Sequence, residues 1–235
     1  MTGPDRPAAQ QQALAETLRQ VLDERGQQWL AQATAAVAAD SGAVARLFPA
    51  AGRALGRREL ADGAAGPWTW TTDEAGRALL LTSLPDDARD GVLRELYRYG
   101  DRFERAAVLR ALDVLPAGRA AQELVPDALR TNDPRLVAAA LSPTGLAVLD
   151  ERELVQAVLK CVFMGLDLAC LPLPEQRITP LLSRALAGYA LERLTAGRSV
   201  PQDVWPLVER HPPHDVLSAV RRLRSGHDPA EEPAR

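Results

Sequence analysis

The chain has 235 residues, of which 46% are hydrophobic and 25% are charged, and its formal net charge is −3. This composition is typical of a globular protein, and the small negative charge argues against a nucleic-acid-binding protein, which normally carries a basic face. Alanine, leucine and valine supply most of the apolar residues, so we expect helices rather than strands.

Both ends of the chain are rich in proline and polar residues, and we predict that residues 1–7 and 225–235 are disordered. Between them we expect one all-α domain over residues 8–224. Its first helix carries a stripe of leucine and valine and is expected to end at Gly26 as a C-terminal cap, with a second helix following over residues 27–40.

The segment from residue 42 to residue 60 contains Pro49, Gly52 and Gly56, which predict a short helix with irregular flanks. A loop then brings Trp68 and Trp70 close together, and we expect these indoles to pack into the core rather than to line a ligand site.

Three apolar helical runs follow, beginning at Arg77, Arg105 and Arg135 and each ending at a proline. Their offsets of 28 and 30 residues suit helical hairpins that bury one another's faces. Further helical patterns continue to the C-terminal region. We therefore predict an all-α fold of stacked antiparallel helical hairpins, either a HEAT-like α-solenoid or an α-α superhelix.

Neither a secretory leader nor an apolar stretch long enough to span a membrane, about 18 residues, is visible in the sequence. We therefore expect a cytoplasmic protein without a membrane span. Cys161 and Cys170 lie in apolar surroundings without the pattern of a zinc site, and we expect reduced core thiols.

Two short motifs could carry chemistry. Asp86 to Asp90 spells DDARD, which matches the magnesium–diphosphate motif of isoprenoid synthases but also suits a helix start after a proline. The stretch HPPHD, residues 211–215, could contribute to a metal site or form the turn before the last helix. We favour the structural interpretation of both, and predict neither a metal nor a cofactor.

The joint at residues 130–134 connects two predicted helices. Asn132 or Asp133 can cap the second helix, and Pro134 suits its first position. Arg130 and Thr131 are not needed for that purpose. Lys160 is the one lysine in a chain with 28 basic residues, and lysine differs from arginine in being a compact charge whose pKa responds to burial.

Three stretches, LRTND (129–133), QAVLKCVFMG (156–165) and GYALERLTAGR (188–198), occur in this order. Together they resemble the EboA family of metabolite-traffic proteins, over about residues 45–210. This chain departs from the family pattern at Leu154-Val155, at 142–145, and at Leu191, where family members carry a histidine, so a histidine-dependent role does not transfer.

The resemblance implies a role within a biosynthetic gene cluster that also encodes a prenyltransferase. The partners it implies are proteins of that cluster or a small-molecule metabolite. The motifs mark a set of ligand-binding candidates: Arg130, Thr131, Asn132, Lys160, Tyr189, Glu192 and Arg193. The alternative for these residues is a buried polar network that sets the register of the helices.

Two functions follow from this sequence. The first is a non-enzymatic helical adaptor or carrier in secondary-metabolite biosynthesis and traffic. The alternative is a pathway enzyme that acts on an anionic or prenylated intermediate through Lys160, Arg130 and nearby acids. No nucleophile–base pair or metal set is recognisable in the sequence, which favours the first function.

Overall fold

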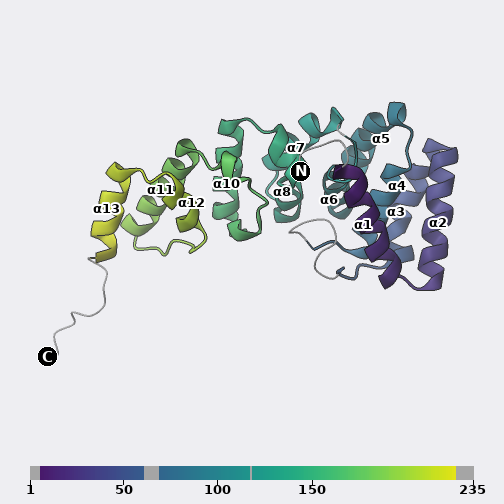
Figure 1. Cartoon of the computed structure of the whole chain (residues 1–235), viewed down its shortest axis with the longest axis horizontal. Coiled ribbons are helices and arrows are strands. Elements are labelled where there is room, and N and C mark those ends of the chain that lie inside the picture. The colour runs from purple at the N-terminus through teal and green to yellow at the C-terminus, as the bar shows by residue number, and fades with distance from the viewer. Residues whose placement is uncertain (1–5, 61–68, 117, 226–235) are drawn as a thin grey trace. The chain divides into compact units, whose positions relative to one another are not determined.

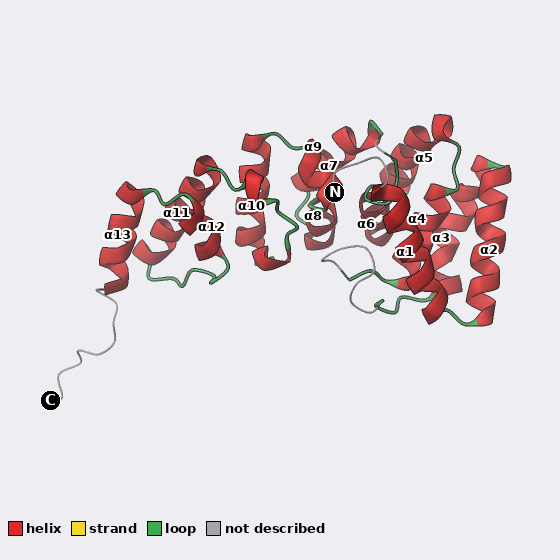
Figure 2. Cartoon of the chain, in the orientation of Figure 1, coloured by secondary structure: helices red, strands yellow, loops and turns green. Residues whose placement is uncertain are grey.

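The computed structural model describes residues 6–60, 69–116 and 118–225, and within these ranges it contains thirteen α-helices and no β-strand (Figures 1 and 2). The predicted all-α class is confirmed. The described chain divides into two compact units, residues 1–149 and 150–235. The solenoid arrangement and the single domain over residues 8–224 stay predictions, and the predicted disordered ends fall largely outside the described residues.

The first unit contains nine α-helices and one 3-10 helix in its described part. They are α1 (Arg6–Val21), α2 (Glu24–Ala39), η1 (Ser41–Ala43), α3 (Val44–Leu55), α4 (Thr72–Thr82), α5 (Asp86–Tyr99), α6 (Arg102–Ala111), α7 (Ala120–Arg130), α8 (Pro134–Ala140) and α9 (Pro143–Val148).

Helix α4 is the centre of the first unit. All ten residues from Thr72 to Leu81 are buried, because α1, α2, α3 and α6 all pack against this helix. A helix that is packed on every side must lie close to at least one neighbour, and α4 lies close to α3 at Gly76. A Cβ atom at Gly76 would lie 2.1 Å from the Cδ1 atom of Leu55 of α3, so any other residue at this position would require the Leu55 side chain to move.

The second unit contains α10 (Glu151–Met164), η2 (Leu168–Cys170), η3 (Glu175–Arg177), α11 (Pro180–Thr195), α12 (Val204–Arg210) and α13 (His214–Ser225). Helix α11 packs against α10, α12 and α13, and its apolar face is buried. Helix α10 starts at a capping box, in which Asp150 accepts the Glu153 N–H and Glu153 accepts the Asp150 N–H, and it ends at Gly165 in the left-handed conformation.

Two predicted helix boundaries are wrong. Gly26 lies inside α2 rather than at the end of the first helix, because Asp23 caps α2 by accepting the Gly26 N–H (2.8 Å). Helix α3 continues through Pro49 and Gly52 to Leu55, because its apolar face packs against α4. Tertiary packing therefore outweighs the local helix-breaking tendency.

Several other expectations are confirmed. Trp70 is buried, whereas Trp68 lies outside the described residues. Both cysteines are free thiols, but only Cys161 is a core residue as predicted, whereas Cys170 is half-buried. None of the helices in the described ranges is long and apolar enough to cross a membrane.

Candidate functional site

The joint between α7 and α8 has the cap that the sequence predicts. Of the two candidates, Asp133 is the residue that caps α8, accepting the backbone N–H of Arg135 (2.9 Å), and Pro134 occupies the first helical position. Asn132 is exposed. The joint is therefore built by local rules of helix termination.

Arg130 and Thr131 end α7. The hydroxyl of Thr131 donates to the Ala128 carbonyl (2.7 Å), which satisfies one of the free carbonyls at this helix end, and Arg130 is exposed. A side chain that bonds its own helix has a structural role, whereas the exposed Arg130 is available to a ligand.

The other predicted ligand residues lie in the second unit. Tyr189 is buried and its ring meets Phe163 edge-on at 5.1 Å, Lys160 is half-buried, and Glu192 is exposed. Arg193 donates to the backbone carbonyl six residues later (3.0 Å). Three of the seven predicted residues therefore belong to one unit and four to the other, and their convergence on one site stays a prediction.

The DDARD motif forms the start of a helix, as the structural interpretation proposed. Helix α5 begins at Asp86, whose carboxylate binds Arg89 at 2.6 Å while remaining 90% exposed. Asp90 accepts the backbone N–H groups of Arg119 (3.0 Å) and Ala120 (3.3 Å), so it caps helix α7, the second helix after its own. The two outer aspartates thus have separate structural tasks.

The HPPHD stretch forms the turn between α12 and α13. Asp215 makes two bonds to Arg184 (3.2 and 2.7 Å), so this carboxylate is engaged by a guanidinium group. No grouping of three or more histidine, cysteine, aspartate or glutamate side chains suited to a metal occurs in the part of the chain that the structure describes.

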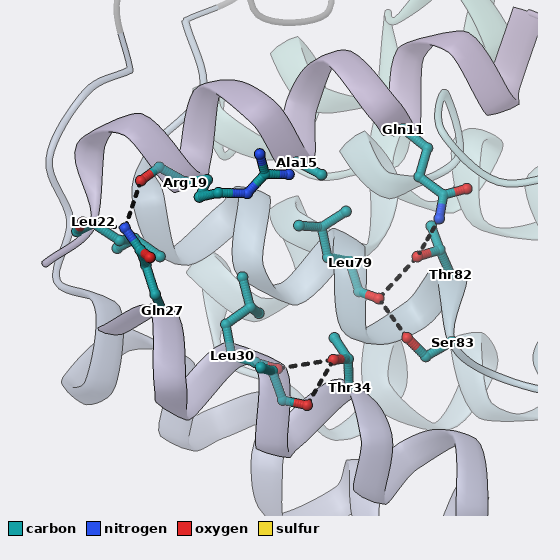
Figure 3. A pocket seen from close by; sticks show the side chains of 11 residues that line it. Gln11, Ala15, Arg19, Leu22, Gln27, Leu30, Thr34, Leu79, Thr82 and Ser83 are labelled. Atoms are coloured by element: carbon teal, nitrogen blue, oxygen red, sulfur yellow. Dashed lines mark hydrogen bonds between the residues drawn. The ribbon is translucent and has the colours of Figure 1, made fainter. Parts of the chain in front are cut away.

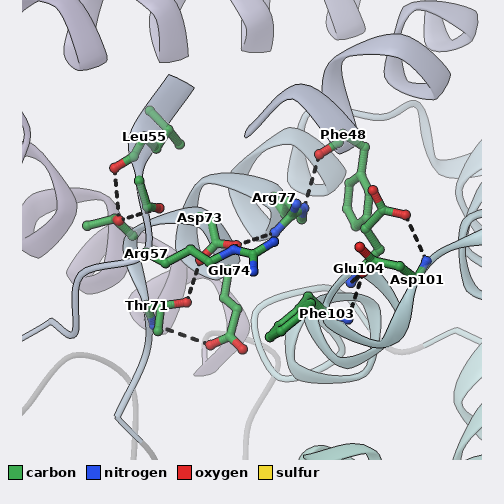
Figure 4. A network of polar contacts seen from close by, with 12 residues as sticks. Phe48, Leu55, Arg57, Thr71, Asp73, Glu74, Arg77, Asp101, Phe103 and Glu104 are labelled. Atoms are coloured by element: carbon green, nitrogen blue, oxygen red, sulfur yellow. Dashed lines mark hydrogen bonds and ion pairs between the residues drawn. The ribbon is translucent and has the colours of Figure 1, made fainter. Parts of the chain in front are cut away.

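The first unit contains a buried ionic cluster that the sequence analysis did not predict. Two consecutive carboxylates, Asp73 and Glu74, lie in the first turn of α4, and each side chain is only 3% exposed (Figure 4). Glu74 accepts the backbone N–H of Thr71 (3.2 Å), which helps to begin α4 five residues before the predicted apolar run. Burying both carboxylates requires cationic partners.

Asp73 is paired with the largest fully buried side chain of the described residues. Arg77 is 1% exposed, and its Nη1 atom lies 2.5 Å from the Asp73 carboxylate while its Nε donates to the Phe48 carbonyl (3.0 Å). Figure 4 shows Arg77 between these two partners, and Arg57 also lies 3.4 Å from the Asp73 carboxylate. The pair fixes α4 against α3.

Glu74 binds two further arginines from distant helices. Arg110 of α6 approaches it at 2.6 Å and Arg135 of α8 at 3.1 Å. Arg110 also donates to the Thr69 carbonyl (2.9 Å), and its guanidinium lies over the Trp70 ring at 4.7 Å. One carboxylate therefore joins three helices of the first unit.

An open pocket of about 480 Å³ lies between α1, α2 and α4 (Figure 3). Its apolar wall comprises Leu22, Leu30 and Leu79, with alanines beside them. Its polar lining consists of hydroxyl and amide side chains and one guanidinium, from Gln11, Arg19, Gln27, Thr34, Thr82 and Ser83.

The polar groups of the pocket are partly engaged already. Gln11 donates to the Thr82 hydroxyl (3.1 Å), and this bond joins α1 to α4. Gln27 donates to the backbone carbonyls of Arg19 and Leu22 at 2.9 and 3.0 Å, which ties α2 to the end of α1. These bonds fix the positions of the Gln11 and Gln27 side chains in the pocket wall.

Two titratable groups of the described chain have strongly shifted pKa values. Burial raises the pKa of the Tyr97 phenol to about 12; its hydroxyl donates to Asp127 (3.0 Å) and accepts from Arg105 (3.0 Å). Burial likewise raises the pKa of the Cys161 thiol to about 12. Both side chains stay protonated at neutral pH, so neither is an activated nucleophile.

A family model described as "Metabolite traffic protein EboA" matches residues 10–209. The chain belongs to the EboA family. The comparisons with curated proteins and with solved structures give no match. The part matched by the EboA model contains the whole pocket, the ionic cluster and all seven residues predicted from the motifs.

The missed cluster left two local signals in the sequence, of which one is the four-residue spacing between Asp73 and Arg77. Thr71 followed three residues later by Glu74 is the pattern of a capping box, and it marks the true start of α4. The arginine partners of Glu74 left no comparable signal, because they are separated from Glu74 by 36 and 61 residues.

Proposed function

We propose that this EboA-family chain is a non-enzymatic helical carrier or adaptor in secondary-metabolite biosynthesis and traffic, and that the pocket between α1, α2 and α4 holds the metabolite. The chemistry of the pocket lining supports this proposal. Its described lining consists of aliphatic, amide and hydroxyl side chains with one arginine. Such a lining binds a ligand through apolar contact and a few hydrogen bonds.

The lining indicates the chemical class of the ligand. Three leucines offer an apolar surface, and the amides and hydroxyls offer hydrogen bonds that do not depend on charge. Arg19 is 61% exposed and is already paired with Glu16 at 2.5 Å. The ligand that fits has a hydrocarbon body, such as a prenyl chain, with a neutral polar group.

The same lining favours transport over reaction. General acid–base or nucleophilic catalysis needs a carboxylate, imidazole, thiol or comparable group beside the reacting atom. The described residues around this pocket offer hydroxyls and amides instead, and no hydroxyl among them is bonded to a histidine. A carrier needs only to bind its ligand and to release it.

The wider context of the proposal comes from the family. We propose that the partners are proteins of the same biosynthetic cluster, that the cluster includes a prenyltransferase, and that the chain acts in the cytoplasm. Arg130, Thr131, Asn132, Lys160, Tyr189, Glu192 and Arg193 stay proposed contacts for the metabolite or a partner protein.

The pocket can be tested with geraniol, a neutral prenyl alcohol, as probe. Ala31 lines the pocket on α2, and Ala38 is an exposed residue of the same helix that does not line it. We expect Ala31→Phe to fill the pocket and abolish geraniol binding in calorimetry, whereas Ala38→Phe retains it.

Native mass spectrometry of the chain purified from its own host adds a second readout. The wild type should retain a small molecule that Ala31→Phe lacks. Equal binding by both variants would remove the pocket from the proposal, and conversion of the bound metabolite by the pure chain would establish the enzymatic alternative.

A further inference from the structure

Three guanidinium groups gather around the Phe103 ring at the start of α6. Arg57 lies 4.0 Å from the ring centroid, Arg135 lies 4.8 Å from it, and Arg102 lies 5.3 Å from it. They come from three different segments: the chain after α3, helix α8, and the start of α6. A ring has two faces, so at least two of these cations lie on the same side of it, where they repel each other.

The arginines of this region outnumber the carboxylates that they contact. Asp73 is shared by Arg77 and Arg57, and Glu74 is shared by Arg110 and Arg135. The remaining contact, between Arg102 and Asp133, is 3.6 Å long. Five guanidinium groups therefore share three carboxylates, which leaves several of their N–H donors without a carboxylate acceptor.

Two more carboxylates lie near Phe103, but both are engaged by the backbone. Asp101 accepts the N–H groups of Phe103 and Glu104 at 2.8 Å each. Glu104 accepts the N–H of Asp101 at 3.0 Å. These bonds cap the first turn of α6, so neither carboxylate is positioned by the arginines.

The arginines also retain unused donors. The Nη2 atom of Arg110 is buried and has no hydrogen-bond partner among the described residues, although such atoms are almost always satisfied. Arg57 and Arg135 are about half exposed, at 48% and 39%, and each contacts its carboxylate through a single nitrogen. A guanidinium group has five N–H donors, so most of them remain available.

We propose that the arginine cluster around Phe103 binds an oxyanionic group, a carboxylate or a phosphate, of a small metabolite. Arg57, Arg102 and Arg135 are the direct contacts. An oxyanion beside the ring accepts their free N–H groups, and the planar guanidinium suits two-pronged bonds to either anion. Asp73 and Glu74 hold the arginines in place.

This oxyanion site is separate from the proposed carrier pocket. The two share no residue: the cluster involves the first two turns of α4, and the pocket involves its last turn. The inference therefore does not depend on the proposed function, and one can fail without the other.

Calorimetry of the full chain with inorganic phosphate and, separately, with citrate tests the site. The ionic strength is kept constant with chloride, because salt screens non-specific attraction to a basic surface. We expect saturable binding of one or both probes. Arg57→Gln and Arg135→Gln should each weaken it about tenfold, the effect of losing one charge-assisted hydrogen bond.

Arg94→Gln is the matched control. Arg94 also belongs to the first unit, its side chain is 38% exposed, close to the 39% of Arg135, and it also contacts one carboxylate, Glu123. Arg94→Gln removes the same charge as Arg135→Gln. If the probe binds at the arginine cluster, Arg94→Gln should therefore change the Kd by less than about twofold.

Arg102→Gln covers the possibility that the other variants unfold, since Arg102 is 60% exposed and its one ion pair is long. It should weaken phosphate or citrate binding while leaving geraniol binding intact. The proposal is overturned if neither probe saturates, if Arg94→Gln weakens binding as much as Arg135→Gln, or if folded Arg102→Gln binds like the wild type.

Discussion

Replacing Arg77 by methionine tests the buried ionic cluster most directly. Methionine keeps an unbranched side chain and good helix propensity, but it removes the partner that lies 2.5 Å from Asp73. Asp73 stays 3% exposed and keeps only the Thr71 hydroxyl (2.6 Å) and the half-exposed Arg57 at 3.4 Å. The variant thus leaves a buried carboxylate with poor compensation.

The expected loss is large. Removing one partner of a buried ion pair costs about 3–5 kcal/mol, and the bond from Nε to the Phe48 carbonyl is lost as well. The whole free energy of unfolding of a domain is about 5–15 kcal/mol, so the variant should be close to unfolding in its first unit.

Urea unfolding followed by circular dichroism measures the loss, and hydrogen exchange of the α4 amides assigns it to the first unit. The double variant Asp73→Asn/Arg77→Met should be more stable than Arg77→Met alone, because no charge is left buried. Arg184→Met, which removes an ion pair with both side chains about 60% exposed, should change stability little.

Two results would refute this reasoning. One is an Arg77→Met variant that unfolds at the same urea concentration as the Arg184→Met variant. The other is a double variant that is less stable than Arg77→Met, which would show that Asp73 does not need its charge compensated.

Three further predictions concern single side chains. Because the folded-state pKa of Tyr97 is about 12, above the unfolded value of about 10, its contribution to stability is complete below about pH 10 and is lost as the pH rises through 12. Ultraviolet titration should show a tyrosinate component near pH 12 that is missing from Tyr97→Phe; its persistence would contradict the assignment. Iodoacetamide at pH 8 should modify Cys170 before Cys161, which is fully buried and has the thiol pKa of about 12, and mass spectrometry reads out the order. Lys160→Met should leave the melting temperature nearly unchanged while metabolite output in a complementation assay is lost; normal output would remove Lys160 from the proposed contacts.

Much of the fold could be predicted from the sequence because the relevant rules are local. The all-α class follows from composition and apolar periodicity. The start of α8 follows from Asp133 and Pro134, and the box at the start of α10 follows from the same capping chemistry. These signals act over a few residues, so the sequence shows them directly.

Helix α3 and the DDARD motif show where such rules stop. Pro49 and Gly52 disfavour a helix locally, yet α3 includes both because burial of its apolar face against α4 stabilises it more than they destabilise it. Asp90 caps α7, 29 residues away, rather than serving its own helix. Both outcomes depend on neighbours that only the folded chain supplies.

The candidate sites likewise depend on neighbours that only the folded chain supplies. Read along the chain, the members of the ionic cluster are ordinary charged residues at helix ends, on helix faces or just after a helix. They occupy positions 57, 73, 74, 77, 110 and 135. Helical periodicity determined which residues point inward, and caps determined where most helices begin. Arg77 reaches Asp73 within α4, but only the packing of α6, α8 and the segment after α3 brought Arg110, Arg135 and Arg57 onto the two carboxylates. A buried charge needs such partners to compensate it.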